Sequence, residues 1–111
     1  MATKVIFRAS KQDFVRNRYY KSSDRHRLSD EELNEVLKYK DISENFEYND
    51  WYGSSTPVKA TLKEVKQGTY GELLFVVTIN KSIPEHYIPS PSDILKGKDL
   101  LFPVSYSLIK L

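Results

Sequence analysis

The sequence predicts a small α+β domain in which an antiparallel β-sheet of four to five strands packs against one main α-helix. Three observations lead to this prediction: a helix-capping signal at Ser29, strand-like alternation after residue 57, and a chain length of 111 residues. A chain of this length normally folds as one domain, which we assign to residues 1–111. A small, partly open β-barrel with an inserted helix is the alternative architecture.

The helix signal begins at Ser29. Residues 29–32 have the sequence Ser-Asp-Glu-Glu, a capping box in which the first and last side chains each accept a hydrogen bond from the other residue's backbone. The acidic residues of the first turn complement the positive end of the helix dipole. Apolar residues then recur at helical spacing, at Leu33, Val36 and Leu37. We expect a helix over residues 30–40, ending near Asp41.

Most of the remaining signals are typical of strands. Apolar and polar residues alternate with period two in several segments, and residues 73–79 form a run of apolar and β-branched residues suited to a central strand. The expected strands are one over residues 3–9, a short one around Phe46 and Tyr48 before a turn at residues 53–57, a hairpin over residues 57–80, and one over residues 100–108. Pro103 has no amide hydrogen, so the last strand should lie at an edge or contain a bulge.

Two other segments complete the predicted architecture. Ser10 followed by Asp13 resembles a helix cap, and the apolar spacing after it predicts a short helix over residues 11–20. Residues 81–98 contain three prolines and Gly97, so we expect a long ordered loop. Loops of this length in a small domain are often functional or packed over a core edge.

Composition excludes several classes of protein. The chain contains no cysteine, which rules out disulfides, thiolate metal sites and thiol nucleophiles. Residues 1–10 are too polar for a secretory signal, and no segment approaches the roughly 20 apolar residues of a membrane span. We therefore expect a cytoplasmic protein with no membrane partner.

The charges are divided along the chain. Residues 1–27 carry eight basic and two acidic side chains, a net charge of +6, whereas residues 28–52 carry two basic and eight acidic side chains, a net charge of −6. The remainder has a net charge of +2, and all five arginines lie within residues 1–27. This division is the strongest feature of the sequence that does not report on the fold.

The basic segment suggests a non-enzymatic protein that binds nucleic acid or another polyanion. Arginine presents a planar fork that matches phosphate oxygens, and neighbouring aromatic rings can stack on bases. The predicted contact residues are Arg16, Arg18, Tyr19, Tyr20, Lys21, Arg25 and Arg27. A simpler interpretation is that these arginines form ion pairs with the acidic helix that follows them.

The acidic segment suggests a different function, a small protein-interaction or inhibitory module of the kind found in phages and mobile elements. Acidic side chains on a helix can imitate a phosphate backbone, and tyrosine and tryptophan are enriched at binding hot spots. The predicted partner-binding residues are Glu31, Glu35, Tyr48, Trp51 and Tyr52. An aromatic cluster before a turn can equally belong to a core.

Catalysis has little support in the sequence, so we predict no enzyme, no catalytic residues, no metal site and no cofactor. His26 and His86 are the only histidines, and neither belongs to a catalytic or metal-ligating motif. The remaining enzymatic possibility is a metal-free ribonuclease, which needs only an acid, a base and cations around the phosphate. Its residues would be Arg16, Arg18, Tyr19, His26 and Arg27.

Overall fold

The computed structural model describes residues 3–16, 21 and 25–109 of the chain. Within these residues the elements are, in order, strands β1 (Thr3–Ala9) and β2 (Phe14–Val15), helix α1 (Asp30–Leu37), strands β3 (Lys40–Asn49), β4 (Ser55–Gln67) and β5 (Leu73–Ile79), the short helix η2 (Glu85–Tyr87), helix α2 (Pro91–Leu95), the short helix η3 (Lys96–Lys98), and strands β6 (Phe102–Pro103) and β7 (Ser107–Ile109). This combination confirms the predicted α+β class.

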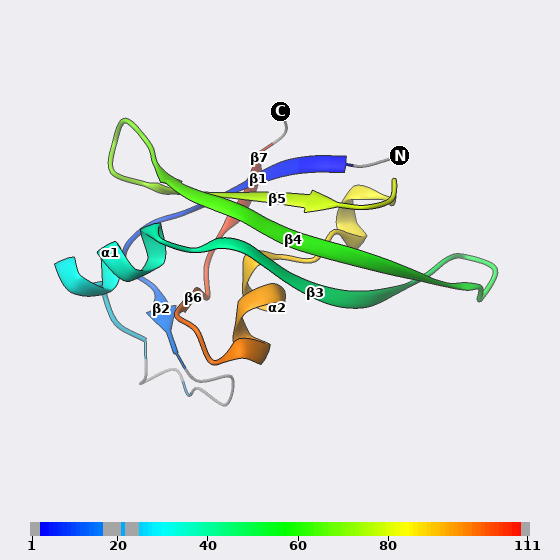
Figure 1. The fold of residues 1–111 in the computed structure, drawn as a ribbon, viewed down its shortest axis with the longest axis horizontal. Helices are drawn as coiled ribbons and strands as arrows, with labels where there is room; N and C mark the ends of the chain where they lie inside the picture. Colours follow the sequence, from blue (N-terminus) through cyan, green and yellow to red (C-terminus); the bar gives the residue numbers. More distant parts are fainter. Residues whose placement is uncertain (1–2, 17–20, 22–24, 110–111) are drawn as a thin grey trace.

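Five strands form one antiparallel sheet within the described residues, in the order β3-β4-β5-β1-β7, and β2 pairs with β6 in a separate two-stranded sheet. Strand β1 therefore lies between β5 and β7, as Figure 1 shows. The edge strands β3 and β7 do not pair with each other in this part of the chain, so the sheet is open. The predicted antiparallel sheet of four to five strands is therefore confirmed, and it does not close into a barrel.

The core lies on one face of the five-stranded sheet. Because side chains alternate along a strand, Val5, Phe7 and Ala9 of β1 are buried while Lys4 and Arg8 are exposed. Helices α1 and α2 and the β2–β6 pair lie on the same side of the sheet (Figure 1). Their buried residues join those of the sheet in one hydrophobic cluster. The exposed residues of β1 thus project from the side of the strand opposite this core.

Helix α1 begins as predicted but ends earlier. The Ser29 hydroxyl accepts a hydrogen bond from the Glu32 N–H at 3.2 Å, and the Glu32 carboxylate accepts one from the Ser29 N–H at 3.0 Å. The capping box is therefore confirmed. The helix ends at Leu37 instead of residue 40, because Lys40 already pairs with Glu64 in the sheet.

One hairpin of the sheet matches the prediction, and the other is longer than the sequence suggested. The hairpin predicted over residues 57–80 is present as β4 and β5, with a register shift between Leu62 and Glu64. Strand β3, predicted as a short strand near Phe46, instead pairs with β4 along nearly its whole length. Consequently the β3–β4 turn lies at residues 50–54, earlier in the chain than predicted.

The predicted helix over residues 11–20 is wrong for the part that the structure describes. Phe14 and Val15 form strand β2 opposite Pro103 and Phe102, and all four residues are buried. Two adjacent buried residues do not form the one-sided stripe of a short surface helix. Residues 17–20 lie outside the described residues.

The predicted strand over residues 100–108 is interrupted. Its first part, β6, pairs with β2, and its last part, β7, pairs with β1 in the larger sheet. Pro103 cannot donate a ladder hydrogen bond, and the next N–H, that of Val104, donates to the Asp13 carbonyl at 3.0 Å. The chain therefore leaves one sheet at Pro103 and enters the other at Ser107.

The predicted loop over residues 81–98 contains helical structure that the sequence analysis missed. Helix α2 has a capping box between Ser90 and Asp93 and a proline, Pro91, at its first position. A proline is favoured there because its missing N–H would have no helical partner in any case. The prolines that suggested a loop include the residue that begins this helix.

Candidate functional site

The basic and acidic segments of the chain meet at helix α1. Arg16 donates to both carboxylate oxygens of Glu35 at 3.1 and 3.0 Å, and His26 Nε2 lies 2.9 Å from the Glu32 carboxylate. Glu35 raises the pKa of Arg16, while the Ser29 N–H, followed by His26, lowers the pKa of Glu32. Part of the positive charge is therefore neutralised within the molecule.

Other predicted phosphate contacts have different surroundings. Lys21, Arg25 and Arg27 are exposed, whereas Arg18, Tyr19 and Tyr20 lie outside the described residues. Neither Arg25 nor Arg27 forms an ion pair with any residue in the described part of the chain. Of the predicted residues that the structure describes, only Arg27 lines the groove described next.

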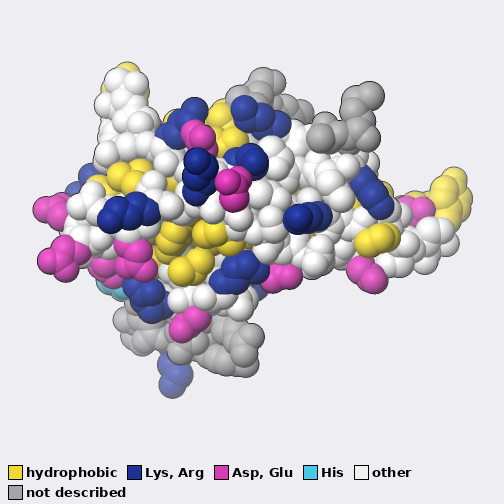
Figure 2. All heavy atoms as spheres, in the orientation of Figure 1, with side chains coloured by type: hydrophobic (Ala, Val, Ile, Leu, Met, Phe, Trp, Pro, Cys, Tyr) yellow, Lys and Arg dark blue, Asp and Glu magenta, His cyan; other side chains and the backbone are white. Residues whose placement is uncertain are grey.

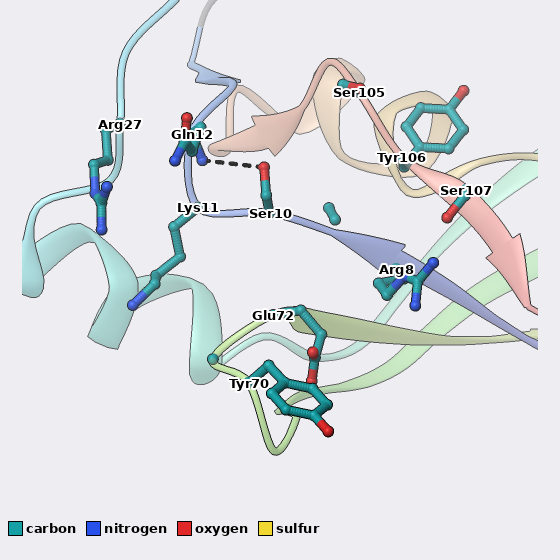
Figure 3. Close-up of a pocket in the computed structure, with 12 residues that line it drawn as sticks. Arg8, Ser10, Lys11, Gln12, Arg27, Tyr70, Glu72, Ser105, Tyr106 and Ser107 are labelled. Carbon is teal, nitrogen blue, oxygen red and sulfur yellow. Dashed lines mark hydrogen bonds between the residues drawn. The ribbon is translucent and has the colours of Figure 1, made fainter.

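A groove of about 680 Å³ lies where the ends of four segments meet. Its lining comes from the end of β1 and the residues after it, from Arg27, from the β4–β5 turn, and from residues 105–107, which lead into β7 (Figure 3). The residues that define its chemistry are Arg8, Lys11, Arg27, Tyr70, Glu72 and Tyr106. We call this site the basic groove.

Backbone pairing places the three cations of the basic groove. Arg8 occupies an outward position of β1, opposite Ser107 of β7 and Leu74 of β5. The N–H of Leu28 donates to the Lys11 carbonyl at 2.9 Å, which holds Arg27 beside the turn that follows β1. In the view of Figure 3, Lys11 and Arg27 lie toward one end of the groove and Arg8 toward the other.

The basic groove carries a net positive charge. Arg8, Lys11 and Arg27 have no ion-pair partner among residues 3–16, 21 and 25–109. Glu72 is the one acidic residue in the described lining, and its side chain folds against Gly68 of its own turn. Three cations against one carboxylate make the groove suited to an anionic ligand.

Two tyrosines border the same groove. Tyr70 lies at the β4–β5 turn with 92% of its surface exposed, and Tyr106 is 42% exposed. The ring of Tyr106 packs edge-to-face on Phe7, with centroids 5.7 Å apart. Sequence analysis missed both tyrosines as well as Arg8 and Lys11, because these residues belong to segments far apart in the chain. The basic composition of residues 1–27 was the only advance signal for Arg8 and Lys11, and Tyr70 and Tyr106 had none.

The predicted partner-binding residues do not form one surface. Tyr48 is half-buried and packs against Tyr87 with ring centroids 5.0 Å apart. Trp51 and Tyr52 lie in the β3–β4 turn and are 93% and 90% exposed. Helix α1, which carries Glu31 and Glu35, lies at the opposite end of the molecule from this turn (Figure 1).

The β3–β4 turn is held in a defined conformation. The Asp50 carboxylate accepts hydrogen bonds from the N–H groups of Tyr52 and Ser54 at 2.9 and 2.8 Å. Gly53 adopts a φ of 81°, a left-handed conformation that favours glycine. We call Trp51 and Tyr52 together the aromatic tip, and the turn that carries them is ordered rather than loose.

The surface as a whole mixes both signs of charge. Figure 2 shows basic and acidic side chains interleaved over the visible face, with acidic side chains gathered at the end where α1 lies. Within the residues that the structure describes, no group of three or more His, Asp or Glu side chains could hold a metal ion. Neither helix in that part of the chain is long and apolar enough to cross a membrane.

No protein-family model, curated protein or solved structure shows significant similarity to this chain.

Proposed function

We propose that this protein binds nucleic acid or another polyanion in the basic groove, without catalysing a reaction. The observation that carries the proposal is the convergence of Arg8, Lys11 and Arg27, three cations without described ion-pair partners, beside two exposed tyrosines. Guanidinium groups contact phosphate oxygens through paired hydrogen bonds, and a lysine adds a mobile point charge.

The rest of the basic segment would extend this surface. Lys21 and Arg25 are exposed in the same part of the chain, and Arg18, Tyr19 and Tyr20 remain predicted contacts. Arg16 differs from them, because its guanidinium already binds the Glu35 carboxylate. We therefore expect Arg16 to contribute less than Arg27.

Salt dependence tests the proposal. Affinity for a fluorescent oligonucleotide and for heparin would be measured between about 50 and 200 mM salt, because binding that depends on phosphate contacts weakens strongly over this range. Each phosphate contact contributes roughly 0.7–0.9 to the slope of log affinity against log salt, so replacing all three groove cations with alanine should reduce the slope by about 2–3. The Arg16→Ala variant should reduce the slope by less than the roughly 0.7–0.9 expected for one phosphate contact.

Lys59→Ala provides the matched control, because Lys59 is an exposed cation of β4 that is neither a predicted contact nor part of the groove lining. Absence of binding to both probes at low salt would refute the proposal. Equal slopes for the wild type and the triple variant would also refute it. RNA cleavage that disappears in His26→Ala would replace it with the ribonuclease alternative.

The aromatic tip supports a second candidate function, docking to a partner protein. Exposed tryptophan and tyrosine on an ordered turn lose little conformational entropy on binding, which makes them effective anchors. Acidic side chains at Glu47 and Asp50 flank the tip, so a partner pocket with a basic rim would complement it. We expect a co-purifying protein to be lost when Trp51 and Tyr52 are replaced by alanine and retained in Arg25→Ala. Loss from both variants, or from neither, would contradict this candidate.

A further inference from the structure

The tyrosines of the basic groove indicate which kind of polyanion it would take. Tyr70 stands on a turn in which the Gly68 N–H donates to the Glu72 carbonyl at 2.8 Å and the Gly71 N–H donates to the Gly68 carbonyl at 3.0 Å. Gly71 has a φ of 81°, so the turn conformation depends on a glycine there. The ring is thus presented on a defined support and is almost fully exposed.

Tyr106 lies in the same groove with its ring oriented by Phe7. Its hydrophobic contact leaves 42% of the residue exposed, enough surface for a flat ligand to pack against it. The tyrosines carry no positive charge, so the electrostatic attraction to phosphate comes from the cations and the ring faces are available for stacking. Cations would hold the backbone of a ligand, and rings would hold its flat groups.

We infer that the ligand of the basic groove is single-stranded nucleic acid, whose phosphates contact Arg8, Lys11 and Arg27 while unpaired bases stack on Tyr70 and Tyr106. This inference rests on the proposed function and specifies it. Such binding would be independent of base sequence, because every base has a ring face on which an aromatic side chain can stack.

A duplex fits these features less well than a single strand. In a duplex the ring faces are covered by neighbouring base pairs, and only the base edges are accessible in the grooves. Exposing a face requires the base to leave the stack, at a cost of a few kcal/mol. A single strand offers its faces directly, and each stacked base contributes about 1–3 kcal/mol. The exposed rings would therefore favour unpaired bases.

The dimensions of the site agree with a short strand. A groove of about 680 Å³ is similar in size to pockets that bind small molecules, which are roughly 300–1,000 Å³. Three cations imply about three phosphate contacts, near the lower end of the 4–16 nucleotides covered by single-strand binding modules. Ser105 and Ser107, both exposed beside Tyr106, add hydroxyls that can bond to sugar or phosphate oxygens.

The test compares a thymidine oligonucleotide of about 12 nucleotides, a ribouridine oligonucleotide of the same length, a duplex of equal length and heparin, with the full chain at low salt. We expect at least tenfold tighter binding of one or both single strands than of the duplex. Tyr70→Ala should weaken single-strand binding by at least fivefold and leave duplex binding nearly unchanged, since one stacked base is lost.

Tyr52→Ala is the matched control for Tyr70→Ala. Both tyrosines are about 90% exposed on hairpin turns, but Tyr52 belongs to the aromatic tip at the other end of β4. Its replacement should leave single-strand affinity unchanged. Glu72→Gln should tighten binding about two- to threefold at low salt, because it removes the carboxylate from the described lining.

The outcomes separate the inference from the proposed function. Equal affinity for single strand and duplex, or an unchanged single-strand affinity in Tyr70→Ala, would overturn the inference. The proposed function would still stand if binding depended on the three groove cations. Binding to heparin alone would likewise overturn the inference. No binding to any probe, or binding unaffected by loss of the three groove cations, would overturn both.

Discussion

Replacing Tyr39 with phenylalanine would test how the chain after helix α1 is fastened to the residues that precede β6. Tyr39 is 7% exposed, and its hydroxyl donates to the carbonyl of the fully buried Leu101 at 3.1 Å. The substitution keeps the ring and removes one oxygen. Because both partners are inside the protein, water cannot easily replace the missing hydroxyl.

The expected loss of stability follows from this geometry. A neutral intramolecular hydrogen bond contributes about 1 kcal/mol net, and a buried acceptor that loses its donor costs roughly 1–3 kcal/mol. We therefore expect Tyr39→Phe to lower the free energy of unfolding by about 1–2 kcal/mol. For a domain of about 100 residues this corresponds to a fall in Tm of roughly 4–8 °C for each kcal/mol.

Urea unfolding followed by far-ultraviolet circular dichroism is the suitable assay. The single tryptophan, Trp51, is already 93% exposed in the folded protein, so its emission should change little on unfolding. Tyr52→Phe, which removes an exposed hydroxyl, serves as the control and should stay within about 0.5 kcal/mol of the wild type. A loss below that size for Tyr39→Phe would refute the role assigned to the buried hydroxyl.

The same hydroxyl makes stability depend on alkaline pH. Burial, and then the nearby Glu35 charge, raise the pKa of Tyr39 in the folded state. Its stabilising contribution is therefore complete below the ordinary tyrosine pKa of about 10 and is lost as pH rises above it, at up to about 1.4 kcal/mol per pH unit. Tyr39→Phe should remove this part of the slope. Identical slopes for variant and wild type would contradict the burial argument.

Four further predictions concern the helix cap and the β3–β4 turn that carries the aromatic tip. Ser29→Ala should cost about 1 kcal/mol in urea unfolding, since it removes the acceptor for the Glu32 N–H, and an unchanged midpoint would contradict the capping role. The pKa of Glu32 is lowered in the folded state, so its contribution to the free energy of unfolding is present above the ordinary glutamate pKa and is lost as the pH falls below it. Glu32→Gln should therefore make the free energy of unfolding, measured by urea unfolding at several acidic pH values, depend less on pH. Gly53→Ala should cost roughly 1–2 kcal/mol through its positive φ alone, since nothing lies within 4 Å of the added methyl group. Replacing Trp51 with alanine should leave the free energy of unfolding within about 0.5 kcal/mol, because the residue has almost no buried surface to lose.

The elements that sequence analysis predicted correctly have their causes within a few residues. The start of α1 depends on the side chains of Ser29 and Glu32, and β1 and the β4–β5 hairpin follow from local alternation. The elements it misassigned depend on distant partners. Phe14 forms a strand because Pro103 lies opposite it, and α1 stops because β3 must pair with β4. Local patterns carry no information about such pairings.

The sequence by itself determined the α+β class, the helix cap and the division of charge into a basic and an acidic segment. Only the tertiary structure decided how those charges are used. Arg16 is paired with Glu35, whereas Arg8, Lys11 and Arg27 come together in a groove whose other wall includes residues beside β7. The physical reason is that ion pairs and binding sites require side chains within a few ångströms. That proximity arises here from the pairing of β1 with β7 and from the Leu28–Lys11 hydrogen bond, which join segments that no local spacing connects.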